Sequence, residues 1–261
     1  MKPAEYDAWY DTPRGSWIGE TENRLLLCRL EPQAGEQLLD VGCGTGWFTR
    51  RLAGQPGIGV TGIDINTEWL EFARSRDRHS SYLRADALCL PFADGSFDRV
   101  ISVTALCFIA DWPRALGEIV RVCRRRFAIG LLNRRSLLWR QKGRDGGVGA
   151  YRGAHWHTAQ EIRRVLDALP VGRVSARSAV FLPSGSGAAR LVERCLPTAF
   201  PFGGFLVVAG DRQRDVSRES SEPVAPVLAG MIRSRHRVAQ NPASPVTSAA
   251  SAIPRFRTFP A

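Results

Sequence analysis

Short apolar runs alternate with stretches of helical periodicity between residues 37 and 209. The apolar runs occupy residues 37–41, 60–64, 81–86, 97–104, 126–133, 175–182 and 205–209. Near-continuous apolar runs of this length are typical of parallel strands that helices cover on both faces. The alternation therefore predicts an α/β fold around a mostly parallel sheet.

Helix signals lie between these runs. Residues 45–52 carry Trp47, Phe48 and Leu52 near helical spacing, directly after a glycine-rich turn. Apolar residues also recur every three or four positions in two later stretches: Leu116, Ile119, Val120 and Cys123, and then Ile162, Val165, Leu166 and Leu169. Asp111, followed by Pro113, is a plausible N-cap for the first, and Thr158 with Glu161 forms a capping box for the second.

Three segments depart from the alternation. Residues 1–36 precede the first strand and contain four large aromatic residues within twelve positions, followed by Leu25, Leu26 and Leu30 at helical spacing. Residues 134–157 are rich in arginine and then in glycine, which predicts a mobile basic insertion between a strand and a helix. Residues 212–261 are rich in proline, serine and arginine with isolated apolar positions, which predicts a disordered basic tail. The intervening residues 37–211 form the predicted domain.

The turn after the first strand is built to approach a polar cofactor. Asp40-Val41-Gly42-Cys43-Gly44-Thr45-Gly46 places glycines at alternate positions, where no Cβ blocks a ligand. The helix that follows offers unpaired N–H groups and the positive end of its dipole. A dinucleotide-binding turn needs its third glycine one place later, and a phosphate-binding P-loop needs a longer spacing followed by Lys and Ser/Thr. Neither pattern is present.

Two further acids follow predicted strands. Asp64 ends residues 60–64, 18 positions after Gly46, and Asp86 ends residues 81–86. One strand–helix–strand step has about this length, so Asp64 is expected at the carboxyl end of the neighbouring strand. A carboxylate there can accept hydrogen bonds from both ribose hydroxyls of a nucleoside.

The glycine turn and these acids resemble motif I and the following motifs of the class I S-adenosylmethionine-dependent methyltransferases. Residues 90–100, Leu-Pro-Phe-Ala-Asp-Gly-Ser-Phe-Asp-Arg-Val, resemble the type 11 subgroup that includes ubiquinone- and menaquinone-biosynthesis enzymes. The resemblance covers roughly residues 30–211. It implies a Rossmann-like methyltransferase sandwich, with a mostly parallel seven-stranded sheet whose last strand runs antiparallel between its neighbours.

The same resemblance implies S-adenosyl-L-methionine as the cofactor. It assigns the amino-acid end to the motif I acid and glycine backbone, the ribose to the second acid and the adenine to the third. The implied cofactor-binding residues are Asp40, Gly42, Cys43, Gly44, Gly46, Asp64, Ile65, Asp86, Ala87 and Thr104. It also implies that residues 1–36 form part of a lid; the alternative is an arm that the aromatic residues anchor to the core.

Methyl transfer from a sulfonium requires alignment, and a base only if the acceptor must lose a proton. Tyr151, His155 and His157 lie at the end of the insertion, which in this fold lies over the acceptor pocket, and are the catalytic candidates. In an extended segment the two imidazoles lie on the same side. Either histidine could be a base, a substrate contact or a structural residue. The His-x-His pattern also suggests a metal site, but no nearby Cys or carboxylate completes a ligand set, so no metal is predicted.

Composition limits the setting and the partners. The apolar fraction of 44% is ordinary, no run is long enough for a transmembrane helix, and residues 1–20 lack a signal peptide's apolar core. Six scattered cysteines without a C-x-x-C pair predict buried thiols in a reducing compartment, hence a cytoplasmic protein.

The net charge of +11 is almost all arginine, and residues 121–144 hold nine basic residues and no acid. Such a block could face an anionic substrate, a lipid surface or nucleic acid, or could be a solvated rim. The main prediction is a methyltransferase acting on a small, quinone-like or otherwise hydrophobic acceptor. An RNA methyltransferase and a non-catalytic protein that binds S-adenosylmethionine are the alternatives, with a dinucleotide oxidoreductase more remote.

Overall fold

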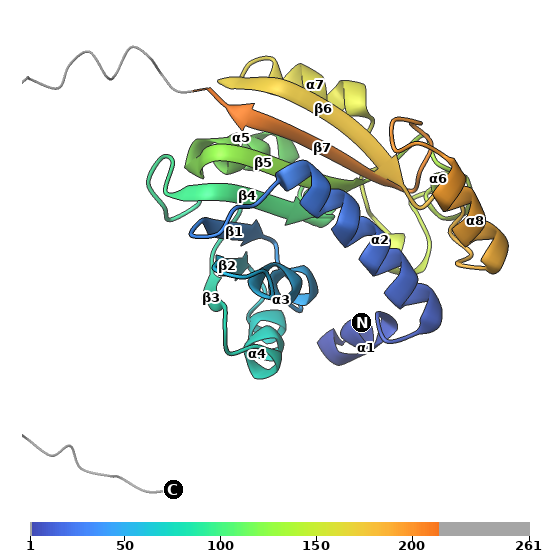
Figure 1. The fold of residues 1–261 in the computed structure, drawn as a ribbon, viewed down its shortest axis with the longest axis horizontal. Coiled ribbons are helices and arrows are strands. Elements are labelled where there is room, and N and C mark those ends of the chain that lie inside the picture. Colours follow the sequence, from blue (N-terminus) through green and yellow to red (C-terminus); the bar gives the residue numbers. More distant parts are fainter. Residues whose placement is uncertain (1, 214–261) are drawn as a thin grey trace, which may run out of the picture. The chain divides into compact units, whose positions relative to one another are not determined.

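A seven-stranded sheet forms the centre of the computed structural model, which describes residues 2–213 (Figure 1). The strand order is β3-β2-β1-β4-β5-β7-β6. The strands span Gln37–Val41 (β1), Gly59–Asp64 (β2), Ser81–Arg84 (β3), Phe97–Val103 (β4), Cys123–Leu132 (β5), Val171–Ala179 (β6) and Phe205–Arg212 (β7). Strands β1 to β5 pair in parallel, and β7 is antiparallel to both β5 and β6. The predicted fold class is confirmed.

Helices cover both faces of the sheet (Figure 1). They span Pro3–Trp9 (α1), Pro13–Leu30 (α2), Trp47–Ala53 (α3), Thr67–Arg76 (α4), Trp112–Val122 (α5), Leu137–Lys142 (α6), Ala159–Leu166 (α7) and Gly187–Cys195 (α8). One apolar cluster joins α5 and α7 to the sheet, and a second joins α2 and α3 to the opposite face. All seven residues of β4 are buried, as expected for a central strand covered on both sides.

The predicted helix starts agree with the structure. The side chain of Asp111 accepts a hydrogen bond from the Arg114 N–H, and Thr158 and Glu161 form a complete capping box on α7. Helix α5 ends one residue earlier than its apolar stripe suggests, because Cys123 already pairs with Phe97 as the first residue of β5. The last two strands are also displaced, with β6 starting at Val171 and β7 extending to Arg212.

The segment between β5 and α7 contains two short elements that the sequence did not predict. Residues 134–157 include α6 and a 3₁₀ turn, η2 (Gly149–Tyr151). Within residues 2–213, no helix is both long and apolar enough to cross a lipid bilayer. The predicted tail, residues 212–261, lies outside the described residues apart from its first two positions, and Arg212 belongs to β7.

The prediction of uniformly buried cysteines is wrong. Cys107 and Cys123 are buried, and Cys43 is half-buried, but Cys28, Cys89 and Cys195 are exposed. All six are free thiols, as predicted. Cys28 and Cys195 lie on helices and Cys89 lies in a turn, so apolar neighbours in the sequence did not guarantee their burial.

Candidate active site

The glycine turn connects β1 to α3 and lies against two other loops. The N–H groups of Gly42 and Cys43 both donate to the Ile63 carbonyl oxygen at 2.8 Å, which fixes the turn beside the end of β2. Gly42 has a φ of +74°, and a Cβ at this position would lie 2.3 Å from the Cβ of Ala105. Ala105 begins η1 (Ala105–Phe108), the turn that follows β4. The close approach of these two loops therefore requires glycine.

The three predicted acids differ in their surroundings. Asp40 is 1% exposed and accepts a 2.7 Å hydrogen bond from the Thr49 hydroxyl. Burial raises the pKa of Asp40 to about 7, although this hydrogen bond opposes the shift. Asp64 accepts one hydrogen bond from the Gly44 N–H and another from the Asn66 N–H, each at 2.9 Å.

The third acid, Asp86, is exposed just beyond β3 and accepts from the Leu88 N–H at 2.9 Å. Ile65 is 59% exposed and Ala87 is half-buried beside these acids. Thr104 directly follows β4 with a φ of +57°, and its N–H donates to the Gly130 carbonyl oxygen at 2.8 Å. The predicted cofactor residues thus lie on the loops at the carboxyl ends of four consecutive parallel strands, β3, β2, β1 and β4.

The two candidate histidines lie close together at the end of the insertion. The His155 N–H donates to the Cys107 carbonyl oxygen at 2.7 Å, and the His157 N–H donates to the Leu132 carbonyl oxygen at 2.9 Å. These bonds hold the segment between η1 and the end of β5. The imidazole centroids are 4.4 Å apart, which confirms that both rings lie on one side.

The surroundings of the two imidazoles are unequal. His157 is fully buried, and burial lowers its pKa to about 4. His155 is exposed, and its Nε2 lies 2.8 Å from Oε1 of Glu161. The expectation that no nearby carboxylate completes the pair is wrong. Glu161, on the first turn of α7, brings a ligand atom within 4.8 Å of one on each histidine. The prediction of no metal site therefore loses its basis.

Comparison with known proteins identifies the domain. Residues 39–127, from β1 into β5, match the family model of a methyltransferase domain. The O-methyltransferase cnsE of Penicillium expansum is 40% identical over 113 residues, covering 41% of each chain. A malonyl-[acyl-carrier protein] O-methyltransferase of Erwinia pyrifoliae is 35% identical over 133 residues, covering 48% of this chain and 50% of the relative. Residues 39–127 are therefore similar to the methyltransferase domain that the resemblance to the class I S-adenosylmethionine-dependent methyltransferases predicts.

A solved structure supports the fold of this methyltransferase domain beyond the matched region. The structure of a possible histamine N-methyltransferase of Thermotoga maritima superposes with a TM-score of 0.66 at 24% identity, covering 80% of this chain and 95% of that chain. The chain spans about half the length, or less, of the curated relatives just described.

Helix α1 and the residue after it pack against α3 and α4. Tyr10 stacks on Trp47 of α3 with centroids 4.2 Å apart, and Tyr6 packs against Trp69 of α4 at 5.1 Å. The buried Asp7 of α1 forms an ion pair with Arg50 of α3 at 2.9 Å. Residues 6–10 therefore contact both helices that follow the predicted cofactor-binding strands β1 and β2.

Glu22 of α2 is a titratable group at this site that the sequence patterns did not indicate. It is half-buried, and desolvation raises its pKa to about 8. Burial raises the pKa of Tyr151 to about 12, and the charge of Glu22 adds to that shift. The two groups are therefore electrostatically coupled, which links α2 to the insertion. Glu22 lies on a helix with no distinctive spacing around it, so only the folded chain reveals it.

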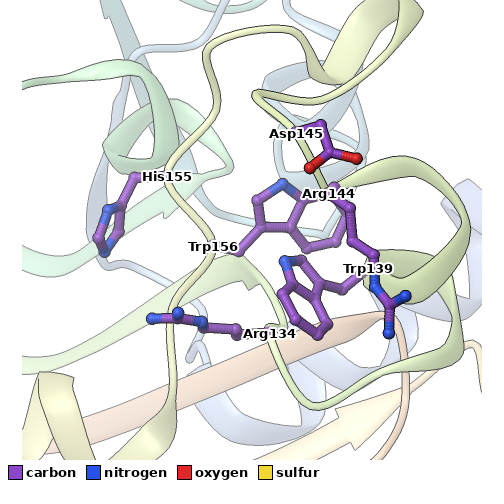
Figure 2. A pocket seen from close by; sticks show the side chains of 7 residues that line it. Arg134, Trp139, Arg144, Asp145, His155 and Trp156 are labelled. Carbon is purple, nitrogen blue, oxygen red and sulfur yellow. The ribbon is translucent and has the colours of Figure 1, made fainter.

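A pocket of about 540 Å³ opens beside the histidines (Figure 2). The guanidinium carbons of Arg134 and Arg144 lie 5.8 and 5.6 Å from the Trp139 ring centroid, within cation–π range. Its lining residues are Arg134, Trp139, Gly143, Arg144, Asp145, His155 and Trp156. The glycine turn does not line this pocket, which belongs to the side where the sequence predicted the acceptor.

Proposed function

We propose that this methyltransferase transfers the methyl group of S-adenosylmethionine to an oxygen atom of a small-molecule acceptor. The hydrogen bond from the Gly44 N–H to the Asp64 carboxylate carries the proposal. It brings the predicted ribose-binding acid next to the glycine turn, at the carboxyl ends of the parallel strands. The two O-methyltransferases described above support oxygen as the accepting atom.

The cofactor would lie across the loops that follow β3, β2, β1 and β4. The backbone of the glycine turn and the half-buried Asp64 offer polar groups to its amino-acid end and its ribose, and the exposed Asp86 offers a carboxylate to its adenine. Asp40 is enclosed and bonded to Thr49, so its proposed contribution is to hold the turn in position. The proposed cofactor-binding residues are Asp40, Gly42, Cys43, Gly44, Gly46, Asp64, Ile65, Asp86, Ala87 and Thr104.

The acceptor would occupy the pocket beside residues 134–157. His155 is exposed there and hydrogen-bonded to Glu161, so it is the proposed base. His157 is enclosed and would act on the acceptor only through its neighbour, and Tyr151 would contact the acceptor. S-adenosylmethionine would supply the methyl group to the acceptor oxygen and leave as S-adenosylhomocysteine, and His155 would take the proton that the acceptor loses. An acceptor that is already anionic needs no base.

Residues 1–36 are proposed as the lid of this site. The stacking of Tyr10 on Trp47 and of Tyr6 against Trp69 supports a position over the cofactor-binding helices. A closed site excludes water and aligns the sulfonium with the acceptor.

Calorimetric titration tests the cofactor first. S-adenosylhomocysteine should bind with one-to-one stoichiometry and NAD should not; binding of NAD alone would overturn the proposal. Transfer is then followed with methyl-labelled S-adenosylmethionine and a panel of phenols, carboxylic acids and matched amines. Label in the oxygen acceptors supports the proposal, whereas label only in the amines contradicts the assignment to oxygen.

A further inference from the structure

We infer that His155, His157 and Glu161, here called the histidine cluster, form a binding site for a divalent transition-metal ion such as Zn²⁺. Each residue offers one ligand atom, and the three atoms lie within 4.8 Å of one another. They come from two elements, the extended end of the insertion and the first turn of α7. The inference concerns ion binding alone and does not depend on the proposed transfer reaction.

The state of the His157 side chain is the strongest support. Its imidazole is fully buried, and neither Nδ1 nor Nε2 makes a hydrogen bond of normal geometry among the described residues; the ring has only a weaker contact with the Leu106 backbone. Buried polar atoms in folded proteins are nearly always paired, and an orphaned one needs an explanation such as an absent ion. A neutral imidazole with a free lone pair is a ready metal ligand.

Glu161 can serve the helix and an ion together. Its Oε2 accepts from the Thr158 N–H at 3.4 Å in the capping box of α7. Its Oε1 points to His155 Nε2 at 2.8 Å. The capping contact therefore occupies one carboxylate oxygen and leaves the other on the side of the imidazoles. Capping alone explains the position of Oε2 but not the contact between Oε1 and His155.

The ligand set selects the class of ion. Two imidazole nitrogens and one carboxylate oxygen suit zinc and its transition-metal neighbours, whereas Mg²⁺ and Ca²⁺ prefer oxygen ligands. Zinc bonds of about 2.1 Å place tetrahedral ligand atoms about 3.4 Å apart. The observed spread, from 2.8 Å between His155 and Glu161 up to 4.8 Å, needs only a small movement. The exposed His155 ring can supply it.

Three protein ligands leave a fourth position open for water or another ligand. Trp112 packs against both rings, with centroid distances of 6.1 Å to His155 and 4.9 Å to His157, and limits their movement on that side. His155 also lines the pocket described above. A bound ion would use the same His155 Nε2 that the proposed base uses, so occupancy by zinc should slow transfer to a protonated acceptor.

The test uses the full chain, freed of metal with EDTA and titrated calorimetrically with ZnCl₂. Wild-type protein should bind one equivalent that His155→Ala and Glu161→Gln each weaken at least about tenfold, consistent with the effect of losing a ligand. Glu161→Gln keeps an oxygen for the cap, so it separates ion binding from the folding of α7. His79→Ala, which removes an exposed histidine in the loop after α4, is the matched control and should bind as wild type does.

Co²⁺ provides an independent signal, because nitrogen and oxygen ligation in a tetrahedral site gives visible absorption bands that the two variants should lose. Equal zinc binding by the variants and wild type, or no stoichiometric binding by wild type, would overturn the inference. Titration of each variant with S-adenosylhomocysteine reports the cofactor site separately. A failure of the proposed function therefore appears in that titration and a failure of the ion site in the zinc titration.

Discussion

At the scale of single residues, Gly42 is the position in the glycine turn that least tolerates a side chain. It combines a φ of +74° with a would-be Cβ only 2.3 Å from the Ala105 Cβ. Gly42→Ala must therefore strain its backbone and push η1 away from the turn, since the obstacle is another short side chain on a fixed loop. We expect the affinity for S-adenosylhomocysteine to fall by about 100-fold, equivalent to about 2.7 kcal/mol, measured by calorimetry.

Gly117→Ala provides the control for that substitution. Gly117 lies within α5, and a Cβ there would meet no atom within 4 Å. This change should leave binding unaltered and raise the free energy of unfolding by up to about 1 kcal/mol, because alanine favours helix over glycine. Equal losses of affinity in both variants would show that Gly42 has no special role in the turn.

Asp64 is the residue whose side chain joins the glycine turn to the end of β2. Its two carboxylate oxygens each accept one backbone N–H, from Gly44 and Asn66. Asp64→Asn replaces one of these acceptors with an NH₂ group, so one contact must be lost. We expect an affinity loss of about 10- to 100-fold for S-adenosylhomocysteine, typical of a charged hydrogen bond. Asp167→Asn, an exposed acid at the end of α7, is the control, and calorimetry should detect no change.

At the scale of elements, the anchoring of α1 depends on one enclosed ion pair. Asp7 is 5% exposed and accepts two hydrogen bonds from Arg50 Nη2, at 2.9 and 3.2 Å. Asp7→Asn should leave the Arg50 charge poorly paired and cost about 2 kcal/mol, below the value for fully buried pairs because Arg50 contacts solvent. Hydrogen exchange of residues 3–9 should accelerate. Asp11→Asn, an exposed acid two residues beyond α1, should have no such effect; equal exchange in both variants would contradict the anchoring role.

Elements with clear end signals were predictable, and those without them were not. Asp111 and Thr158 begin their helices as predicted because a side-chain cap is a local interaction that sequence reveals. The predicted end of α5 was wrong by one residue, because Cys123 fits the apolar face of a helix and of a strand equally well. Its pairing with Phe97 across the sheet decides between them. Irregular ends and the path of residues 134–157 depend on such tertiary contacts.

The candidate site likewise contains some residues that the sequence indicated and others that only the folded structure reveals. The order of Asp40, Asp64 and Asp86 behind the strands was evident in the sequence because parallel strands end at one edge of a sheet. Glu161 was visible only as a capping residue, and its approach to His155 depends on how α7 meets the insertion. Glu22 had no signal at all, since its raised pKa comes from burial in the folded chain.

At the scale of the whole molecule, the basic block of residues 121–144 contains two groups of arginines that make different contacts. Arg121, Arg124 and Arg126 form ion pairs with Glu118, Asp98 and Asp211, respectively. Arg134 and Arg144 instead flank Trp139 in the pocket. Net charge and spacing could not separate these groups, because the pairing acids come from residues 94–118 and from β7. The second group lines the pocket that is proposed for the acceptor.

The dependence of stability on pH follows from the two enclosed acids. The pKa of Glu22 is raised to about 8 and that of Asp40 to about 7, so the folded state keeps protons that the unfolded state releases near pH 4. The unfolded state then binds fewer protons over this interval, and the free energy of unfolding falls as pH rises from about 4 to about 8. Both contributions are fully present below about pH 4. Asp77 and Glu118, whose pKa values are lowered, act in the opposite direction at acid pH.

Urea unfolding of wild type and Glu22→Gln at pH 5 and pH 8 isolates one of these groups. The amide cannot ionise, so the free energy of unfolding of the variant should fall less between pH 5 and pH 8. At pH 8 it should exceed the wild-type value by on the order of 2 kcal/mol. This figure is below the full shift because Glu22 retains some contact with solvent. Glu71→Gln, at an exposed position on α4, should reproduce the wild-type slope. A slope in Glu22→Gln equal to that of wild type would mean that Glu22 ionises freely in the folded protein, and burial would then not raise its pKa.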